Sequence, residues 1–180
     1  MLRQLFQTNI ELKKYKMYKR GDEKTVVGYT SGVYDLFHIG HLNLLKNAKG
    51  LCDKLIVGVT SDEMVSYKNK KAVIRHQERM EIVRNIKHVD VVVPQNDMDK
   101  YKMWERLKFD IMFVGDDWFE SDKWKELDAK FRKVGVKIVY FPYSEGVSST
   151  LINETLKKLR EERSKFIKYD WNLFVERILN

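Results

Sequence analysis

The sequence predicts an α/β fold: a doubly wound, Rossmann-like sheet of five parallel strands with flanking helices. From residue 25 onward, short runs rich in valine and isoleucine alternate with stretches of helical period. The connections between these runs are short, and the 180 residues include only two prolines and nine glycines. Such alternation is typical of repeated strand–helix units, because parallel strands need a crossover connection that is usually a helix.

The expected elements follow from hydrophobic period, since strands repeat every two residues and helices every 3.6 residues. The predicted strands are residues 25–30, 54–60, 90–93, 110–114 and 136–141. The predicted helices are residues 39–48, 75–86, 101–107 and 123–134, with a further helical stretch from Ser148 to Leu159. Three regions are expected, namely a basic N-terminal extension over 1–24, a core domain over 25–160 and a helical C-terminal tail over 161–180.

Bulk composition limits the class of partner and the compartment. The formal charge of +8 favours polyanions, and nucleic acid, acidic lipid and nucleotide phosphates fit it equally well. Cys52 is the only cysteine, so an internal disulfide or a thiol zinc cluster is excluded. No apolar run approaches the roughly 20 residues of a membrane span. We therefore expect a cytoplasmic protein with no membrane span.

The most informative segment, Gly32 to His41, lies between the first predicted strand and the first helix and reads Gly-Val-Tyr-Asp-Leu-Phe-His-Ile-Gly-His. Ligands bind outside the carboxyl ends of parallel strands, where a helix N-terminus offers N–H groups and partial positive charge to phosphates. His38 and His41 are three residues apart and can point toward the same bound group, while Gly40 lets the backbone approach it. The segment predicts a site for an anion that gains charge during a reaction.

Two other interpretations of this segment stand beside the first. The histidines can fall near each other by accident, or they can be zinc ligands. A zinc site needs further ligands, and His76 and His88 lie in helix-like contexts without cysteine support.

The segment Gly32 to His41 resembles the Gly-x-x-Asp-x-x-His-x-Gly-His signature of the cytidylyltransferase family, which includes glycerol-3-phosphate, phosphocholine and phosphoethanolamine cytidylyltransferases. The resemblance runs from about Val26 to Leu159 and is closest to the bacterial glycerol-3-phosphate enzymes. His-Ile-Gly-His is also a signature of class I aminoacyl-tRNA synthetases, but this chain lacks their size and their lysine-rich second signature. Related adenylyltransferases usually have proline where this chain has Leu36. The other matching segments are Lys68, Lys70 and Lys71, then Glu78-Arg79, Lys87 to Asp90, Gly115 to Trp118, and Glu145 to Thr150.

The resemblance implies transfer of CMP from CTP to a phosphomonoester, with glycerol 3-phosphate as the default acceptor and pyrophosphate as the leaving group. The product would be a CDP-activated precursor for a cell-surface polymer or capsule. The implied partners are CTP and a small phosphorylated acceptor, with Mg²⁺ as a cofactor carried by CTP and no protein metal site. The implied catalytic residues are His38, His41, Lys68 and Lys70. Lys68 and Tyr143 are expected to bind the acceptor. The implied nucleotide-binding residues are Gly32, Val33, Tyr34, Asp35, Gly40, Arg79, Lys87, Asp90, Gly115, Asp116, Asp117, Ser148, Ser149 and Thr150.

Several roles keep a plainer alternative. The lysines at 68 and 70 can be a solvated run, Asp35 a helix cap, and residues 148–150 an N-cap. Tyr143 stands where the family usually has arginine, and Val33 where the bacterial glycerol enzymes have threonine. Phosphocholine, phosphoethanolamine or a phosphorylated amino acid therefore stay open as acceptors, as does a degenerate transferase that turns CTP over poorly.

A non-catalytic nucleic-acid-binding protein is the alternative from another class, motivated by the positive charge and by lysines interleaved with aromatics. It leaves His38, His41 and Asp35 unexplained, so no nucleic-acid partner is expected. Relatives of this family commonly pair, and a homodimer is expected.

Overall fold

The computed structural model of the chain describes residues 25–66, 71–115, 122–142 and 146–162, and it contains the predicted sheet. All strand pairs are parallel, in the order β3-β2-β1-β4-β5. The predicted doubly wound α/β fold is therefore confirmed. The strands are β1 (Val27–Gly32), β2 (Lys54–Thr60), β3 (Val91–Gln95), β4 (Ile111–Gly115) and β5 (Lys137–Phe141).

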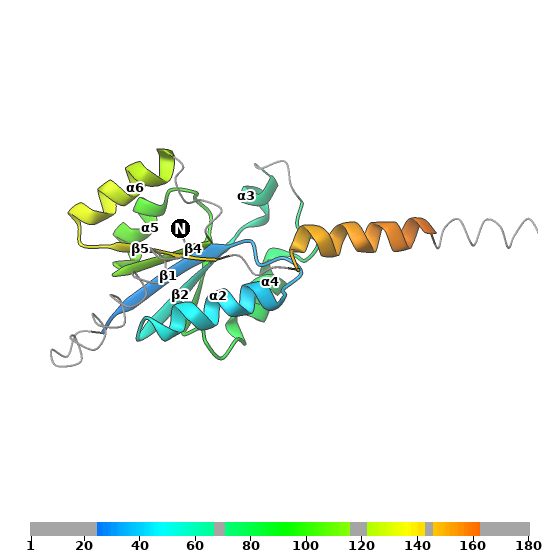
Figure 1. Ribbon diagram of the computed structural model, residues 1–180, viewed down its shortest axis with the longest axis horizontal. Coiled ribbons are helices and arrows are strands. Elements are labelled where there is room, and N and C mark those ends of the chain that lie inside the picture. Colours follow the sequence, from blue (N-terminus) through cyan, green and yellow to red (C-terminus); the bar gives the residue numbers. More distant parts are fainter. Residues whose placement is uncertain (1–24, 67–70, 116–121, 143–145, 163–180) are drawn as a thin grey trace, which may run out of the picture. The chain divides into compact units, whose positions relative to one another are not determined.

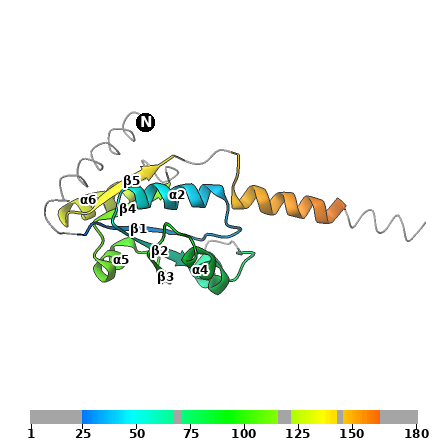
Figure 2. The same cartoon turned by 90° about the horizontal axis from the view of Figure 1, so that it is seen from below.

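Helices cover both faces of this sheet. On one face lie α2 (Ile39–Gly50) and α4 (His76–Arg84), and on the other lie α5 (Lys100–Leu107) and α6 (Asp122–Lys133), as Figures 1 and 2 show. The chain steps from β1 outward to β3 and then returns to β4 and β5 beyond β1, so right-handed crossovers fall on opposite faces. The switch point, where doubly wound sheets bind ligands, lies between β1 and β4.

The two faces bury two hydrophobic clusters. The cluster on the α2 and α4 face includes Leu45 and Phe113, both with no exposed surface. The cluster on the α5 and α6 face includes Met112 and Phe131, also fully buried. Neighbouring residues of β4 thus serve opposite clusters, as the two-residue period of a strand requires. A sheet buried on both faces explains why its strands appear in the sequence as continuous apolar runs.

One described element, α3 (Asp62–Ser66), was not expected from the sequence. It is a single turn that directly follows β2 and begins with two acidic residues, Asp62 and Glu63. Five residues are too few to display a helical hydrophobic period. Its contribution lies in Asp62, whose contacts are described below.

The chain divides into two compact units, residues 1–145 and 146–180, and each is described by itself. In the second unit, residues 149–162 form a helix. The Oγ of Ser148 accepts a hydrogen bond from the N–H of Leu151 at 3.1 Å, so Ser148 caps this helix. Among the described helices none is long and apolar enough to cross a membrane.

Candidate active site

The turn that follows β1 has an unusual backbone. Tyr34 and Leu36 have φ angles of 55° and 46°, a region that residues other than glycine adopt only at an energetic cost. Tyr34 is 3% exposed and holds this conformation by packing into the core on the α2 side. A side chain at Gly32 would place its Cβ 3.2 Å from the Tyr34 ring, so glycine makes room for this packing. The turn brings the chain to the start of α2, where the two histidines lie.

His38 and His41 close the N-terminus of α2 with reciprocal hydrogen bonds. His38 is the N-cap residue, and its Nδ1 accepts from the N–H of Gly40 at 3.1 Å. The Nδ1 of His41 accepts from the N–H of His38 at 3.4 Å. Because both Nδ1 atoms accept, the proton of each neutral ring lies on Nε2. The two rings, with centroids 4.0 Å apart, therefore each carry an Nε2–H donor.

Both rings are held in the neutral form. The pKa of His41 is lowered to about 4, mainly by burial and in addition by the nearby His38, while Asp35 acts in the opposite sense. Burial also lowers the pKa of His38. Tyr34 and Phe37 pack beside the His41 ring, with centroids 5.3 and 5.4 Å from it. At neutral pH the pair consists of hydrogen-bond donors that carry no charge.

The N-terminus of α2 itself adds positive potential. Its first turn contains no acidic residue, so the partial positive charge of the helix dipole is not neutralised there. Helix N–H groups and two imidazole N–H groups together form a set of donors suited to phosphate oxygens.

Asp35 joins this turn to the segment before α4. Its carboxylate accepts hydrogen bonds from the backbone N–H groups of Val73 at 2.8 Å and Ile74 at 2.9 Å. The same segment follows the expected lysines Lys68 and Lys70, which lie outside the described residues. Asp35 thus fixes one end of the lysine-bearing connection to the histidine turn.

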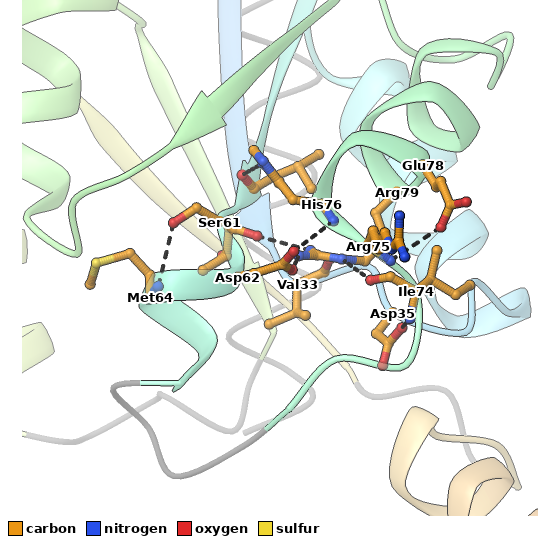
Figure 3. Close-up of polar contacts among 12 residues, drawn as sticks. Val33, Asp35, Ser61, Asp62, Met64, Ile74, Arg75, His76, Glu78 and Arg79 are labelled. Atoms are coloured by element: carbon orange, nitrogen blue, oxygen red, sulfur yellow. Dashed lines mark hydrogen bonds and ion pairs between the residues drawn. The ribbon is translucent and has the colours of Figure 1, made fainter.

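Arg79, on α4, also contacts this region, and Figure 3 shows it together with Asp62, Val33 and Ile74. The side chain has no exposed surface. Its guanidinium donates to the carbonyl oxygens of Ile74 and Thr60, both at 2.9 Å, and to that of Val33, and it pairs with Asp62 at 2.6 Å. The arginine that the resemblance assigned to the nucleotide is therefore fully engaged with the protein, tying the end of β1 to the end of β2.

Asp62 and His76 complete this cluster. The Asp62 carboxylate also accepts from the backbone N–H of His76 at 3.0 Å. Burial alone would raise the pKa of Asp62, but the His76 N–H and the Arg79 guanidinium hold it below its usual value. The Nε2 of His76 lies 3.0 Å from the carbonyl oxygen of Val59, which can only accept, so Nε2 carries the proton here as well. This histidine has a structural partner and is not available as a metal ligand through Nε2.

A cavity of about 850 Å³ lies at the switch point, beside the first residues of the motif. Its lining includes the carboxyl end of β1 from Thr30, the last residue of β2 (Thr60), the last residue of β4 (Gly115) and parts of α5 and α6. Gly32 and Val33 lie in its wall. The volume is in the range of small-molecule sites. Lys100 also lines it, with Nζ 2.8 Å from the Oγ of Ser31.

The structure brings only part of the expected site together. Gly32 to His41, Gly115 and the cavity share the carboxyl edge of the sheet. Asp90 precedes β3 at the opposite edge, where its carboxylate accepts from the Leu55 N–H and pairs with Lys49, both at 2.6 Å. Six residues of β1 separate the two edges by about 20 Å. Burial alone would raise the pKa of Asp90, and these two partners hold it below its usual value.

The remaining expected residues are placed as follows. Lys87 is exposed in the connection from α4 to β3, near Asp90 in the sequence and away from the histidine edge. Ser148, Ser149 and Thr150 begin the helix of the second unit. Lys68, Lys70, Asp116, Asp117 and Tyr143 lie outside the described residues.

Ser31, Thr60 and Lys100 line the cavity and were not singled out from the sequence. The position of Ser31 and Thr60 in the sequence could have indicated them, because each lies at or directly after the carboxyl end of a predicted strand. Ligands bind at this edge of a parallel sheet. Lys100 had no such signal among 34 basic residues.

The sheet is doubly wound, and the first helix after β1 begins with a His-x-Gly-His turn that presents two neutral imidazole donors. This arrangement is that of a class of nucleotidyltransferases, and this protein is one of them. A family model described as cytidylyltransferase-like matches residues 29–155. The chain belongs to the cytidylyltransferase-like family.

Individual relatives agree with this assignment. The chain is 36% identical over 143 residues to a glycerol-3-phosphate cytidylyltransferase of Bacillus subtilis, covering 76% of this chain and 99% of that protein. It is 33% identical over 134 residues to the protein of the same name from Staphylococcus aureus, covering 74% of this chain and 95% of that one. Among solved structures, a lipopolysaccharide core biosynthesis protein of Thermoplasma volcanium is similar with a TM-score of 0.59 and 27% identity, covering 69% of this chain and all of that chain.

Proposed function

We propose that the protein transfers CMP from CTP to glycerol 3-phosphate and releases pyrophosphate. The observation that carries the proposal is the pair of neutral imidazole donors, His38 and His41, at an uncompensated helix N-terminus. The relatives named glycerol-3-phosphate cytidylyltransferase support the choice of both substrates. The product, a CDP-linked glycerol, would be an activated precursor for a cell-surface polymer, formed in the cytoplasm.

The reaction requires that the two substrates be positioned and that the negative charge on the phosphate oxygens be stabilised. An oxygen of the acceptor phosphate attacks the α-phosphorus of CTP, and the bond from that phosphorus to the oxygen bridging to the β-phosphate breaks. The attacking oxygen is already ionised, so no proton has to be removed from it. Negative charge grows on the phosphate oxygens, where preorganised donors have their greatest effect.

The two histidines fit that task in the neutral form that their Nδ1 contacts and lowered pKa values indicate. Each presents Nε2–H as a donor, and neither needs to gain or lose a proton during the transfer. Loss of one preorganised donor to a developing oxyanion typically costs about 3–4 kcal/mol, or 10²- to 10³-fold in turnover. We assign both rings to the α- and β-phosphate oxygens.

Other parts of the site follow from the family resemblance. We propose Lys68 and Lys70 as phosphate ligands, Asp116 and Asp117 as ribose or cytosine contacts, and residues 148–150 as phosphate contacts. For Arg79 and Asp35 we propose a positioning role, because both are engaged with backbone groups. Lys87 and Asp90 are not part of the proposed site, since they lie toward the other edge of the sheet.

Mg²⁺ is proposed to arrive bound to the triphosphate. Among the described residues no group of three or more histidine, cysteine, aspartate or glutamate side chains is arranged to hold a metal ion. These residues do not form a protein metal cage, and no step above is assigned to the ion.

The acceptor is the least constrained part of the proposal. Tyr143 replaces the arginine usual in the family, and Val33 replaces the threonine of the bacterial glycerol enzymes. Phosphocholine, phosphoethanolamine and phosphorylated amino acids are the alternatives that an assay must include.

The experiment measures pyrophosphate release with each of CTP, ATP, UTP and GTP against glycerol 3-phosphate and the three alternative acceptors. We expect turnover with CTP and glycerol 3-phosphate, reduced 10²- to 10³-fold in His41→Ala. His88→Gln is the matched control, because this histidine lies between α4 and β3 and should leave turnover unchanged. Turnover with another nucleotide in preference to CTP would refute the cytidylyl assignment.

A further inference from the structure

Lys100 occupies a place that helix stability alone does not favour. It is the first residue of α5, where the partial positive charge of the helix dipole disfavours a cation. Asp99, the N-cap residue, satisfies the helix by accepting from the N–H groups of Tyr101 and Lys102 at 2.8 and 3.2 Å. The lysine therefore adds nothing to the capping of α5, and its ammonium group is instead turned toward the end of β1.

Ser31 is one partner of that ammonium group. The Nζ of Lys100 lies 2.8 Å from the Ser31 Oγ, and both residues line the cavity at the switch point. Ser31 immediately precedes Gly32, the first residue of the histidine motif. The ammonium thus lies within the cavity wall, next to the turn that leads to the proposed phosphate site.

The surrounding walls combine apolar and charged side chains, and the charged ones besides Lys100 are Asp99, Glu126 and Lys130. Met98, Met112, Val114 and Trp124 line the cavity together with Lys100. Binding sites of this kind orient a ligand through a small number of polar groups set in apolar surroundings. Here Ser31 and Lys100 form one polar end of the cavity, which can donate hydrogen bonds to a ligand.

From this geometry we propose that Lys100 is a specificity-determining residue that hydrogen-bonds the end of the acceptor remote from its phosphate. This inference rests on the proposed function, because it concerns the acceptor of that same reaction. The phosphate of the acceptor binds at the histidine edge, and the rest of the molecule extends into the cavity toward Lys100 and Ser31. An acceptor whose free end carries hydroxyl groups can accept a hydrogen bond from Lys100, whereas an ammonium group at that end has no lone pair with which to accept one.

The test is a comparison of Lys100→Met with Lys102→Met. Lys102 lies on the same helix but is 64% exposed and pairs with Asp97 at 3.2 Å, which makes it the matched control. We expect Lys100→Met to raise the KM for glycerol 3-phosphate about 10- to 100-fold, the factor that a hydrogen bond to a charged group provides. The KM for CTP should stay within about twofold, and Lys102→Met should change neither constant.

Charge reversal gives a second, independent readout. Lys100→Glu should shift the ratio of kcat/KM for phosphoethanolamine over glycerol 3-phosphate upward by at least about tenfold. A rise in the KM for CTP as large as that for the acceptor, or an unchanged acceptor preference, would overturn the inference. Thermal unfolding of each variant confirms that the comparison is made on folded protein.

Failure of the proposed function leaves the inference testable. If the unmodified protein turns over no acceptor with CTP, ligand-observed NMR of glycerol 3-phosphate binding replaces the kinetic assay. Binding weakened by Lys100→Met and not by Lys102→Met supports the cavity as its site. Equal binding to all three proteins, or no binding to any, refutes it.

Discussion

Replacing Arg79 with methionine should destabilise the protein strongly and leave its affinity for CTP largely intact. The side chain is fully buried and donates to three backbone carbonyl oxygens, of Val33, Thr60 and Ile74, besides pairing with Asp62. Methionine fills a similar volume but donates nothing. Three carbonyl groups would lose a donor, while Asp62, with its side chain 52% exposed, can regain hydrogen bonds from water.

The expected size follows from those contacts. A buried polar group left without its partner costs about 1–3 kcal/mol. Each of the three carbonyl groups can still accept through its second lone pair, and the surrounding structure can relax, so the cost per group lies near the lower end of that range. The expected loss in the free energy of unfolding is therefore about 3–5 kcal/mol. Since small domains have about 5–15 kcal/mol of total stability, this is a large fraction of it.

The assay is urea unfolding followed by tryptophan fluorescence, with the free energy of unfolding obtained by linear extrapolation. Arg84→Met is the control, because Arg84 lies on the same helix but is exposed and pairs only with the neighbouring Glu81. Its loss should cost less than about 1 kcal/mol. CTP binding is then measured at low temperature, where the Arg79 variant is still folded. A loss of stability below about 1 kcal/mol together with a tenfold or greater loss of CTP affinity would show that Arg79 contacts the nucleotide and would refute the positioning role.

Three further predictions concern stability and assembly. Because the pKa of His41 is about 4 in the folded protein and 6.5 in the reference state, the unfolded chain takes up the proton first. The free energy of unfolding should therefore fall by about 3 kcal/mol as the pH drops from 6.5 to 4, and His41→Asn should flatten that slope in acid titrations followed by circular dichroism. Gly58→Ala should cost about 1–3 kcal/mol in urea melts, since its Cβ would collide with the Tyr29 hydroxyl that donates to Gln95, whereas Gly50→Ala meets nothing and should be neutral. Light scattering should give twice the 21.5 kDa mass of one chain, and a strict monomer would contradict the expected homodimer.

The fold was predictable because its signals are repeated along the chain. A sheet covered on both faces needs strands that are apolar at successive positions, and β2, β3, β4 and β5 each have such a run. The α3 turn gave no signal, because five residues cannot show a period. The amphipathic faces of α5 and α6 were long enough to do so.

The site was predictable where the chemistry lies in one contiguous segment. Gly32 to His41 contains both histidines, the aspartate and the turn, so the sequence indicated their common location. The protonation state of the rings was not predictable, since it depends on which nitrogen accepts the Gly40 and His38 N–H groups. A match to a family motif also does not distinguish a residue that contacts the substrate from one that positions other residues of the site.

Arg79, Asp90 and Lys100 illustrate that limit. Arg79 and Asp90 lie in matching motifs, yet one is buried against backbone carbonyl groups and the other binds Lys49 at the far edge of the sheet. Lys100 lies outside every motif and reaches the cavity only because α5 begins beside the end of β1. Such placements depend on contacts between residues that are 69 positions apart in the chain, as for Lys100 and Ser31.

The most direct test of the central claim is ³¹P NMR of CTP and glycerol 3-phosphate incubated with the protein and Mg²⁺. The account predicts that resonances of a CDP-linked diester and of free pyrophosphate appear together in equal amounts, and that both are lost in His38→Ala and His41→Ala. Formation of CDP with inorganic phosphate, or of pyrophosphate with no diester, would contradict it.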